Sequence, residues 1–464
     1  MKSRNFVNLN VNPCKMCMPM GASIAFKGIE GCAVILHGSQ GCSTYIRRHM
    51  ATHYNEPVDI ASSCLNEKGT VYGGAQNLKK GLKNVIKLYN PKAIGIATTC
   101  LAETIGEDIN RIVQDFKIEE KAENIHFVTV PTPGYGASQY EGYYAALRSI
   151  LEQTVKPSEN NEKVNIIVGN ISPGSIRHIK EMVEAFGIKY TIFPDSSETL
   201  DAPYQSSYNR LPKGGTRLED IRKMGGSRAT IEMDLLIGDE HSPGKYLEDA
   251  YDVPLYRCPL PIGMENTDKF IEILSTISNK YIPKSIQDER GRMLDAMVDS
   301  HKYNAEGRAA VFGSPEMVYG ITKLCLENGI KPCVIATGSN TNRLKDLLKV
   351  ENYDMLLEDT LIMEDTDFET IRQHVIERKV NILIGHSDGR FIEEKDHIPL
   401  VRVGFPVHDR VGAQRKVFVG YKGSTELLDE VTNTLLANKY NTFKTRMFRE
   451  YFDASASVER REGD

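Results

Sequence analysis

The chain has 464 residues, more than one hydrophobic core normally holds, so we expect two or three domains. Its composition, 41% hydrophobic and 26% charged, is that of a globular protein, and a net charge of −5 offers no basic face for nucleic acid. No apolar run reaches the ~20 residues that span a bilayer, and the polar N-terminus lacks the apolar core of a signal peptide, so we expect a cytoplasmic protein without a membrane partner.

Short runs rich in Val, Ile and Ala alternate with amphipathic segments, which predicts βα units and parallel sheets. The first block, residues 1–160, ends in a polar stretch that we interpret as a linker, Pro157–Lys163. Its predicted strands are Ala33–His37, Pro57–Ala61, Ala93–Ala97 and Ile125–Val130, and its predicted helices include Leu101–Ile118 and Ser138–Gln153.

The same pattern restarts twice, so we predict a second block at 161–303 and a third at 304–464. Predicted strands of the second block are Val164–Gly169, Tyr190–Pro194, Met233–Ile237 and Pro254–Arg257, before a long helical region at Asp268–Tyr303. Predicted elements of the third block are the strands Ala309–Gly313, Cys333–Thr337, Met355–Glu358, Asn381–Gly385 and Leu400–Gly404, a helix at Ser424–Ala437 and a frayed tail, Asp453–Asp464.

Three of the nine cysteines lie at turns where ligands commonly bind. Cys17 lies in a loop with Pro and Gly before the first strand, while Cys42 and Cys100 each follow a strand and begin a helix. Ligands in open α/β sheets bind beyond the carboxyl ends of the strands, so two such cysteines can converge on one point. A helix N-terminus also favours the thiolate that metals require.

The number of candidate ligands leaves two interpretations open. Isolated cysteines at strand ends are usually small core residues, and a zinc ion or an iron–sulfur cluster takes about four protein ligands. The missing ligands come either from Cys14, as a CxxC pair with Cys17, or from a second chain. His37, His49 and His53 are further possible ligands, although a basic helix explains the last two.

Several segments together resemble the nitrogenase component 1 family, and within it the β-type subunits. The segments are CMPMGASIAFKGIEGCAVILHGSQGC, EPVDIASSCLNEKGTVYGG, IATTCLAETIGEDI, IFPDSSETLDAP, ILIGHSDGRF and VRVGFPVHDRVG. The resemblance extends from Asn12 to Leu436, and the combination of HGSQGC, TTCxxE and GFPxxDR is highly specific.

The resemblance implies a cluster site at defined positions. Cys17, Cys42 and Cys100 match the cysteines with which a β-type subunit holds its half of the P-cluster, an eight-iron, seven-sulfide centre shared between two subunits. Gly41 matches the glycine whose backbone lies against that cluster, and Glu103 matches the acidic residue after the third cysteine. The family fold implied is α/β, with three Rossmann-like domains whose parallel sheets are flanked by helices.

The same resemblance implies an oxidoreductase subunit and its partners. The chain is expected to pair with an α-type subunit in an α2β2 heterotetramer and to receive electrons from an ATP-dependent iron protein. Its cluster would relay these electrons to an active site on the α-type partner, so no catalytic residue is expected in this chain.

Two positions depart from the family pattern. Gly134 stands where the dinitrogen-reducing β subunits have a serine that ligates the oxidised cluster, so a simpler four-iron, four-sulfide cluster remains an alternative. Cys14 stands where those subunits have alanine. The substrate is therefore open between dinitrogen and another small molecule.

One functional alternative is a non-catalytic subunit. The β-type member of the scaffold pair on which the nitrogenase cofactor matures shares the GIEGCAVILHGSQGC segment, but commonly lacks the third cysteine that this chain retains as Cys100. Cys258, Cys325 and Cys333 match no ligand pattern and are predicted to be packing residues.

Overall fold

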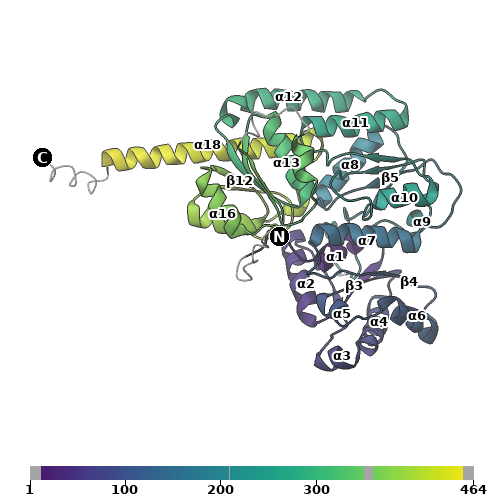
Figure 1. Cartoon of the computed structure of the whole chain (residues 1–464). Helices are drawn as coiled ribbons and strands as arrows, with labels where there is room; N and C mark the ends of the chain where they lie inside the picture. The colour runs from purple at the N-terminus through teal and green to yellow at the C-terminus, as the bar shows by residue number, and fades with distance from the viewer. Residues whose placement is uncertain (1–11, 208, 350–358, 453–464) are drawn as a thin grey trace.

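The computed structural model describes residues 12–207, 209–349 and 359–452, which fold into three parallel β-sheets flanked by helices (Figure 1). The strand orders are β2-β1-β3-β4, β6-β5-β7-β8 and β11-β10-β9-β12-β13. Parallel strands need crossover helices, which cover both faces of each sheet. The predicted α/β class with three Rossmann-like units is therefore confirmed.

The first sheet carries the cysteine-rich part of the chain. Its central strands, β1 and β3, are buried along their whole length, as expected for strands covered on both faces. The elements are α1 (Met18–Lys27), β1 (Cys32–His37), α2 (Gln40–Tyr54), β2 (Ala61–Ser62), α3 (Glu67–Tyr72), α4 (Ala75–Tyr89), β3 (Ala93–Thr98), α5 (Cys100–Thr104), α6 (Ile109–Glu120), β4 (His126–Val130) and α7 (Gln139–Thr154).

The second sheet is followed by two consecutive long helices. The elements are β5 (Val164–Ile167), α8 (Pro173–Ala185), β6 (Tyr190–Phe193), α9 (Leu218–Arg222), a 3-10 helix (Met224–Gly226), β7 (Ala229–Glu232), α10 (Pro243–Tyr251), β8 (Leu255–Arg257), α11 (Met264–Ser278) and α12 (Lys284–Asn304). Pro283 directly precedes α12 and separates it from α11, because proline starts helices readily but interrupts them.

The third sheet has five strands in the described part of the chain. The elements are β9 (Arg308–Gly313), α13 (Pro315–Glu327), β10 (Lys331–Thr337), α14 (Leu344–Lys349), β11 (Leu361–Met363), α16 (Phe368–Glu377), β12 (Ile382–Gly385), a 3-10 helix (Ser387–Gly389), α17 (Arg390–Asp396), β13 (Leu400–Arg402), a 3-10 helix (Ala413–Arg415) and α18 (Gly420–Phe452). The three sheets lie inside the three predicted blocks, whose boundaries remain a prediction.

Several predicted elements were wrong in position or extent. The predicted strand Met233–Ile237 is a turn, because the Asp234 carboxylate accepts hydrogen bonds from the backbone N–H groups of Leu236 and Ile237. The predicted helix Leu101–Ile118 is two helices, α5 and α6, separated at Gly106, whose φ is +73°. The strand predicted at Pro57–Ala61 is displaced to Ala61–Ser62.

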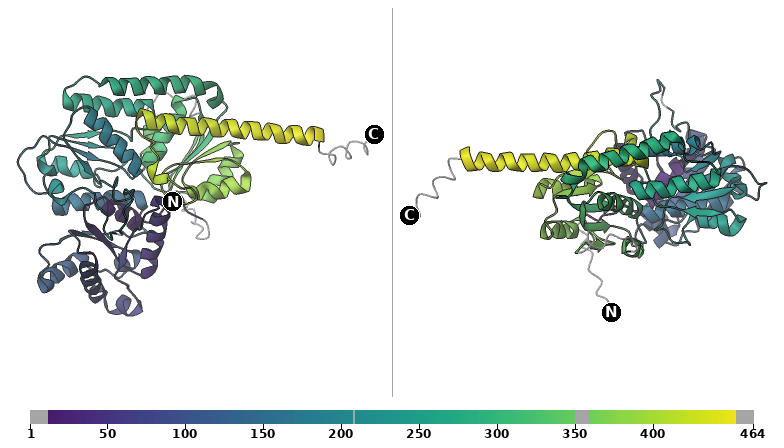
Figure 2. Two further views of the ribbon diagram at one scale, coloured as in Figure 1. Left: turned by 180° about the vertical axis from the view of Figure 1, so that it is seen from behind. Right: turned by 90° about the horizontal axis from the view of Figure 1, so that it is seen from above.

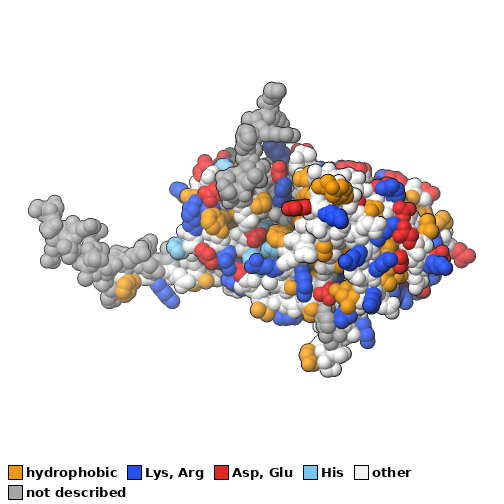
Figure 3. Space-filling model, turned by 90° about the horizontal axis from the view of Figure 1, so that it is seen from below, with side chains coloured by type: hydrophobic (Ala, Val, Ile, Leu, Met, Phe, Trp, Pro, Cys, Tyr) orange, Lys and Arg blue, Asp and Glu red, His pale blue; other side chains and the backbone are white. Residues whose placement is uncertain are grey.

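At the end of the chain, α18 is much longer than predicted and projects from the body (Figures 1 and 2). Its first half packs against α12. The predicted strand Met355–Glu358 and the tail Asp453–Asp464 lie outside the described residues. None of the helices in the described ranges combines the length and apolar composition needed to cross a bilayer. Acidic and basic side chains are interspersed over the face seen in Figure 3.

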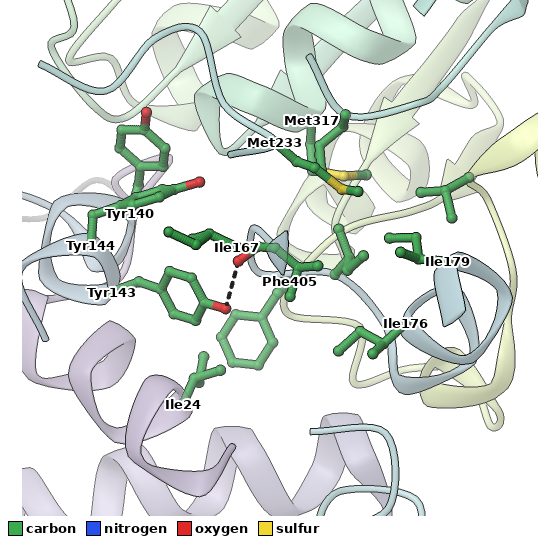
Figure 4. Close-up of a cluster of buried hydrophobic side chains, with 14 of the residues drawn as sticks. Ile24, Tyr140, Tyr143, Tyr144, Ile167, Ile176, Ile179, Met233, Met317 and Phe405 are labelled. Atoms are coloured by element: carbon green, nitrogen blue, oxygen red, sulfur yellow. Dashed lines mark hydrogen bonds between the residues drawn. The ribbon is translucent and has the colours of Figure 1, made fainter. Parts of the chain in front are cut away.

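One hydrophobic core joins the three sheets. Figure 4 shows part of it, in which Tyr143 and Tyr144 of α7 belong to the same cluster as Met233, from the loop after β7, and Met317 of α13. The Tyr143 hydroxyl donates to the carbonyl of Val168 at 3.1 Å. Helix α7 of the first block therefore contributes side chains to the core that all three blocks share.

Helices α1 and α7 approach so closely that glycine is required on both. A Cβ atom on Gly21 would lie 1.8 Å from the carbonyl oxygen of Gln139, and one on Gly142 would lie 2.1 Å from that of Met18. Backbone-to-backbone contact of this kind cannot relax by moving a side chain. The crossing fixes the start of α1, directly after Cys17.

We expect Gly142→Ala to destabilise the protein by about 3 kcal/mol or more, because the new methyl group forces α1 and α7 apart. Urea denaturation measures this change. Gly291→Ala is the matched control, since Gly291 lies in α12 and a methyl group there would meet no atom within 4 Å, so alanine should stabilise slightly. Equal stability of Gly142→Ala and the wild type would contradict the close crossing.

Candidate cluster site

Cys17 is held by a clamp between the N-terminal segment and the start of α7. It is the N-cap residue of α1 and forms an antiparallel bridge with Ser138. Next to it, the Met16 N–H donates to Oε1 of Gln139 at 2.6 Å, and the Gln139 N–H donates to the Met16 carbonyl at 2.8 Å. These paired bonds fix the backbone directly before the cysteine.

Cys42 and Cys100 follow neighbouring parallel strands. Strand β1 leads to Cys42 in the first turn of α2, and β3 leads to Cys100, the first residue of α5. The two strands pair in register from Cys32 with Ala93 to His37 with Thr98, so both cysteines lie at the same edge of the sheet. This arrangement matches the sequence-based expectation for ligands at strand ends.

The loop after β4 brings Gly134 against two of the cysteines. The Thr132 hydroxyl donates to the Thr98 carbonyl at 2.6 Å, and the Thr132 N–H donates to the Thr98 hydroxyl at 2.8 Å, which holds the loop at the end of β3. A Cβ atom on Gly134 would lie 3.1 Å from Sγ of Cys100 and 3.2 Å from Cβ of Cys17. Cys17, Cys100 and Gly134 are therefore in direct proximity.

The three thiols form an edge that is open to the outside. Cys17 and Cys42 are half-buried, and Cys100 is exposed. Burial, with a smaller contribution from the neighbouring Cys42 and Cys100 thiols, outweighs the hydrogen bond from the Met20 N–H and raises the pKa of Cys17 to about 11. Like charges so close together disfavour three free thiolates, whereas a bound cation would favour them.

Within the described residues, no three or more His, Cys, Asp or Glu side chains form a site for a metal ion. The three thiols of this chain thus do not form a complete site for a single metal ion.

Gly41 and Glu103 differ in what the structure shows of them. Gly41 is exposed, and its Cβ position would meet only the Ser39 hydroxyl, at 3.7 Å, so packing within this chain does not require glycine there. The Thr98 hydroxyl donates to Oε1 of Glu103 at 2.5 Å, which joins the start of α5 to the end of β3. Glu103 therefore supports the helix that begins with Cys100.

The remaining cysteines do not join the three. Cys14 is 1% exposed and belongs to the core of the third sheet, so it makes no pair with Cys17. Cys258, Cys325 and Cys333 are buried among hydrophobic residues, as predicted. Cys64 is exposed, and its sulfur accepts a hydrogen bond from the side chain of Gln40.

Sequence patterns did not identify the residues that hold the site together. The Thr98–Thr132 pair and the Met16–Gln139 clamp join segments far apart in the chain, and single threonines or glutamines carry no distinctive spacing. The run VPTPG at the end of β4 was the one available signal, because it placed Gly134 in a tight loop.

Comparison with known proteins gives one consistent result. The family described as Nitrogenase component 1 type Oxidoreductase matches residues 17–436. The nitrogenase molybdenum-iron protein beta chain of Methanococcus maripaludis is 37% identical over 93% of this chain and 96% of its own length. The corresponding chain of Clostridium pasteurianum is 35% identical over 92% of this chain and 93% of its own length. The nitrogenase vanadium-iron protein beta chain of Trichormus variabilis is 34% identical over 92% of this chain and 94% of its own length.

Solved structures agree with the sequence matches. A chain of the structure entitled "Nitrogenase Cp1 at pH 6.5" superposes with a TM-score of 0.88 at 34% identity, covering 93% of this chain and 94% of that one. A chain of "Nitrogenase Cp1 at pH 5" has a TM-score of 0.69 at 15% identity and shares the fold alone.

Proposed function

The chain belongs to the nitrogenase component 1 type oxidoreductase family as a β-type chain, and from this membership we propose that it relays electrons through a shared iron–sulfur cluster. In this function it pairs with an α-type subunit in an α2β2 heterotetramer. An ATP-dependent iron protein supplies the electrons, and the active site lies on the α-type partner.

The observation that carries the proposal is the open edge formed by Cys17, Cys42 and Cys100. Three thiols close enough to influence one another, two of them at helix starts, suit an anionic multi-iron group. The exposure of Cys100 and the free space beside Gly41 leave room for a group covered by a second chain. We therefore assign these three cysteines as ligands of this chain's half of a P-cluster or of a simpler four-iron cluster.

Measuring the cluster in the purified complex tests the proposal directly. The chain is co-expressed with the α-type chain, the complex is purified without oxygen, and its iron is counted and examined by EPR. The proposal expects a stable complex with several iron atoms for each pair of chains. A stable iron-free monomer would overturn it, and iron that leaves for another protein during maturation would favour the scaffold function.

Replacing Gly134 by serine tests how an oxygen atom beside the cluster changes its redox potential. We expect Gly134→Ser to lower the midpoint potential of the most oxidised couple, because an anionic serine oxygen stabilises oxidised iron. Gly134→Ala is the matched control, since it places the same Cβ atom 3.1 Å from Sγ of Cys100 without an oxygen. Redox titration followed by EPR measures both, and identical shifts would attribute the effect to crowding alone.

All nine cysteines are free thiols, which suits the reducing cytoplasm that we propose as the compartment. The substrate, dinitrogen or another small molecule, is set by the α-type chain.

A further inference from the structure

Cys14 is fixed to the third sheet, although it lies only three residues before Cys17. Its N–H donates to the carbonyl of Thr366 at 3.0 Å. A Cβ atom on Gly338 would lie 2.3 Å from the Cys14 carbonyl oxygen, so backbone packs on backbone there. The thiol points away from the open edge and is buried among residues of the third sheet. The segment that carries Cys17 is thus tied to a different block from the one that carries Cys42.

The thiol of Cys14 meets a buried histidine. Its sulfur lies 4.0 Å from Nε2 of His386, which follows β12 and is 3% exposed. The rings of Phe312 and Phe368 pack edge-on against this imidazole at 5.6 and 5.5 Å, so its orientation is fixed. Burial raises the pKa of Cys14, which keeps the sulfur protonated and able to donate to Nε2.

A carboxylate occupies the other side of that histidine. Oδ2 of Asp388 lies at an ion-pair distance of 3.3 Å from Nδ1 of His386, a buried nitrogen with no hydrogen-bond partner in the described structure. The carboxylate favours a proton on Nδ1, which leaves Nε2 as the acceptor for the thiol. Cys14, His386 and Asp388 therefore form one connected polar unit inside an apolar core.

Asp388 also acts on two further elements. Burial alone would raise its pKa, but the contact with His386 and the charges of His408 and His49 outweigh burial and hold the pKa below its ordinary value. His49 belongs to α2, the helix that begins beside Cys42, and its ring lies 6.4 Å from that of His408. The charge of Asp388 is thus felt at His49 of α2 and at His408 of the loop after β13.

The other titratable groups around this unit are Tyr45, Asp367 and Arg48. Tyr45 experiences the charges of both Asp388 and Cys17, and its hydroxyl lies 3.0 Å from the sulfur of Met16. Asp367 acts on Cys14, and Arg48 acts on His49.

We propose that Asp388 is a positioning residue for the cluster site, acting through His386 and Cys14 on the segment of Cys17. This inference rests on the proposed function. Because this unit ties the segment of Cys17 to the third sheet, whereas Cys42 belongs to the first block, its loss changes their relative position without removing a ligand. The potential of an iron–sulfur cluster depends on its sulfur geometry, nearby charge and solvent exposure, so it should respond.

The test uses the anaerobic complex with the α-type chain, in which iron, the EPR spectrum and the midpoint potential are measured. Cys14→Ala changes no charge and tests position alone, and we expect it to retain iron but to alter the EPR spectrum and shift the potential. Asp388→Asn should do the same and also raise the potential, because a negative charge near the cluster is lost. The double variant should show less than the sum of the two shifts, as expected for residues of one network.

Asp365→Asn is the matched control. Asp365 also contacts the N-terminal segment, through Lys15 at 2.5 Å, but this ion pair is exposed and should leave the cluster unchanged. Wild-type spectra and potentials in both Cys14→Ala and Asp388→Asn would overturn the inference and leave the proposed function intact. If Asp388→Asn fails to fold, Cys14→Ala decides alone. A wild-type complex without iron would overturn the proposed function and this inference with it.

Discussion

Replacing Cys42 or Cys100 by alanine should strip the purified complex of most of its iron and abolish the EPR signal of its cluster. Each thiol is one of the three that we propose as ligands at the edge of the first sheet, and each stands in the first turn of a helix. A multi-iron cluster cannot replace a lost thiolate with water at the same strength. Iron counting and EPR on anaerobic samples measure the loss.

Cys64→Ala is the control for this experiment. Cys64 lies in the same block and is exposed, but it contacts Gln40 rather than the three thiols. Its replacement should leave both iron content and the EPR signal at wild-type values. Equal iron in the Cys42, Cys100 and Cys64 variants would show that these cysteines hold no cluster.

A second large effect should come from two carboxyl groups in the core where the three sheets meet. Asp234 is buried and accepts hydrogen bonds from the backbone N–H groups of Leu236 and Ile237 and from the Tyr140 hydroxyl, whose single proton is shared between the two carboxylate oxygens at 3.0 and 3.1 Å. Glu316, in the first turn of α13, accepts one from the Ser314 hydroxyl, and its Oε2 has no partner in the described structure. Asp234 is therefore the member that stays ionised, and Glu316 holds a proton.

Glu316→Gln should make the protein more stable than the wild type at pH 8, by ~2–4 kcal/mol, and this advantage should disappear as the pH falls to about 4. Burial and the charge of Asp234 raise the pKa of Glu316 from 4.5 to about 8. In the wild type the folded state retains a proton that the unfolded chain releases, so stability falls as pH rises from 4.5 to 8. Glutamine carries no such proton. Denaturation midpoints measured at intervals across this range give the difference.

The control for this prediction is Glu394→Gln, which changes an exposed carboxylate in an ion pair with Arg390. Its stability relative to the wild type should not vary over the same pH range by more than a few tenths of a kcal/mol. A Glu316→Gln variant whose pH profile parallels the wild type would show that Glu316 is ionised in the fold.

The sequence predicted the sheets well because buried parallel strands are apolar along their whole length. Ala93–Ala97 and Asn381–Gly385 could be identified from composition alone. The prediction failed where a side chain changes the local backbone conformation. The run Met233–Ile237 has the composition of a strand, but the Asp234 carboxylate accepts hydrogen bonds from two backbone N–H groups and the segment forms a turn. Strand β11, at Leu361–Met363, is too short to stand out from its surroundings.

For the candidate site, the sequence predicted where residues lie only when local structure determines their position. Cys42 and Cys100 follow adjacent strands, so their convergence follows from parallel pairing. The direction of the Cys14 side chain could not be predicted, because it depends on His386, a residue far away in the sequence. The Asp234 and Glu316 pair was missed for the same reason, since neither residue stands in a recognisable motif.

The attachment of Cys14 to the third sheet also orders the events of synthesis. The segment with Cys14 and Cys17 leaves the ribosome first, yet its docking surface includes Thr366 and His386 and exists only after nearly the whole chain has been made. Domains generally fold as they emerge, and contacts between distant residues form late. Cys17 can therefore meet the start of α7 while the chain is still being made, but the Cys14 end of its segment docks only after the third sheet has formed.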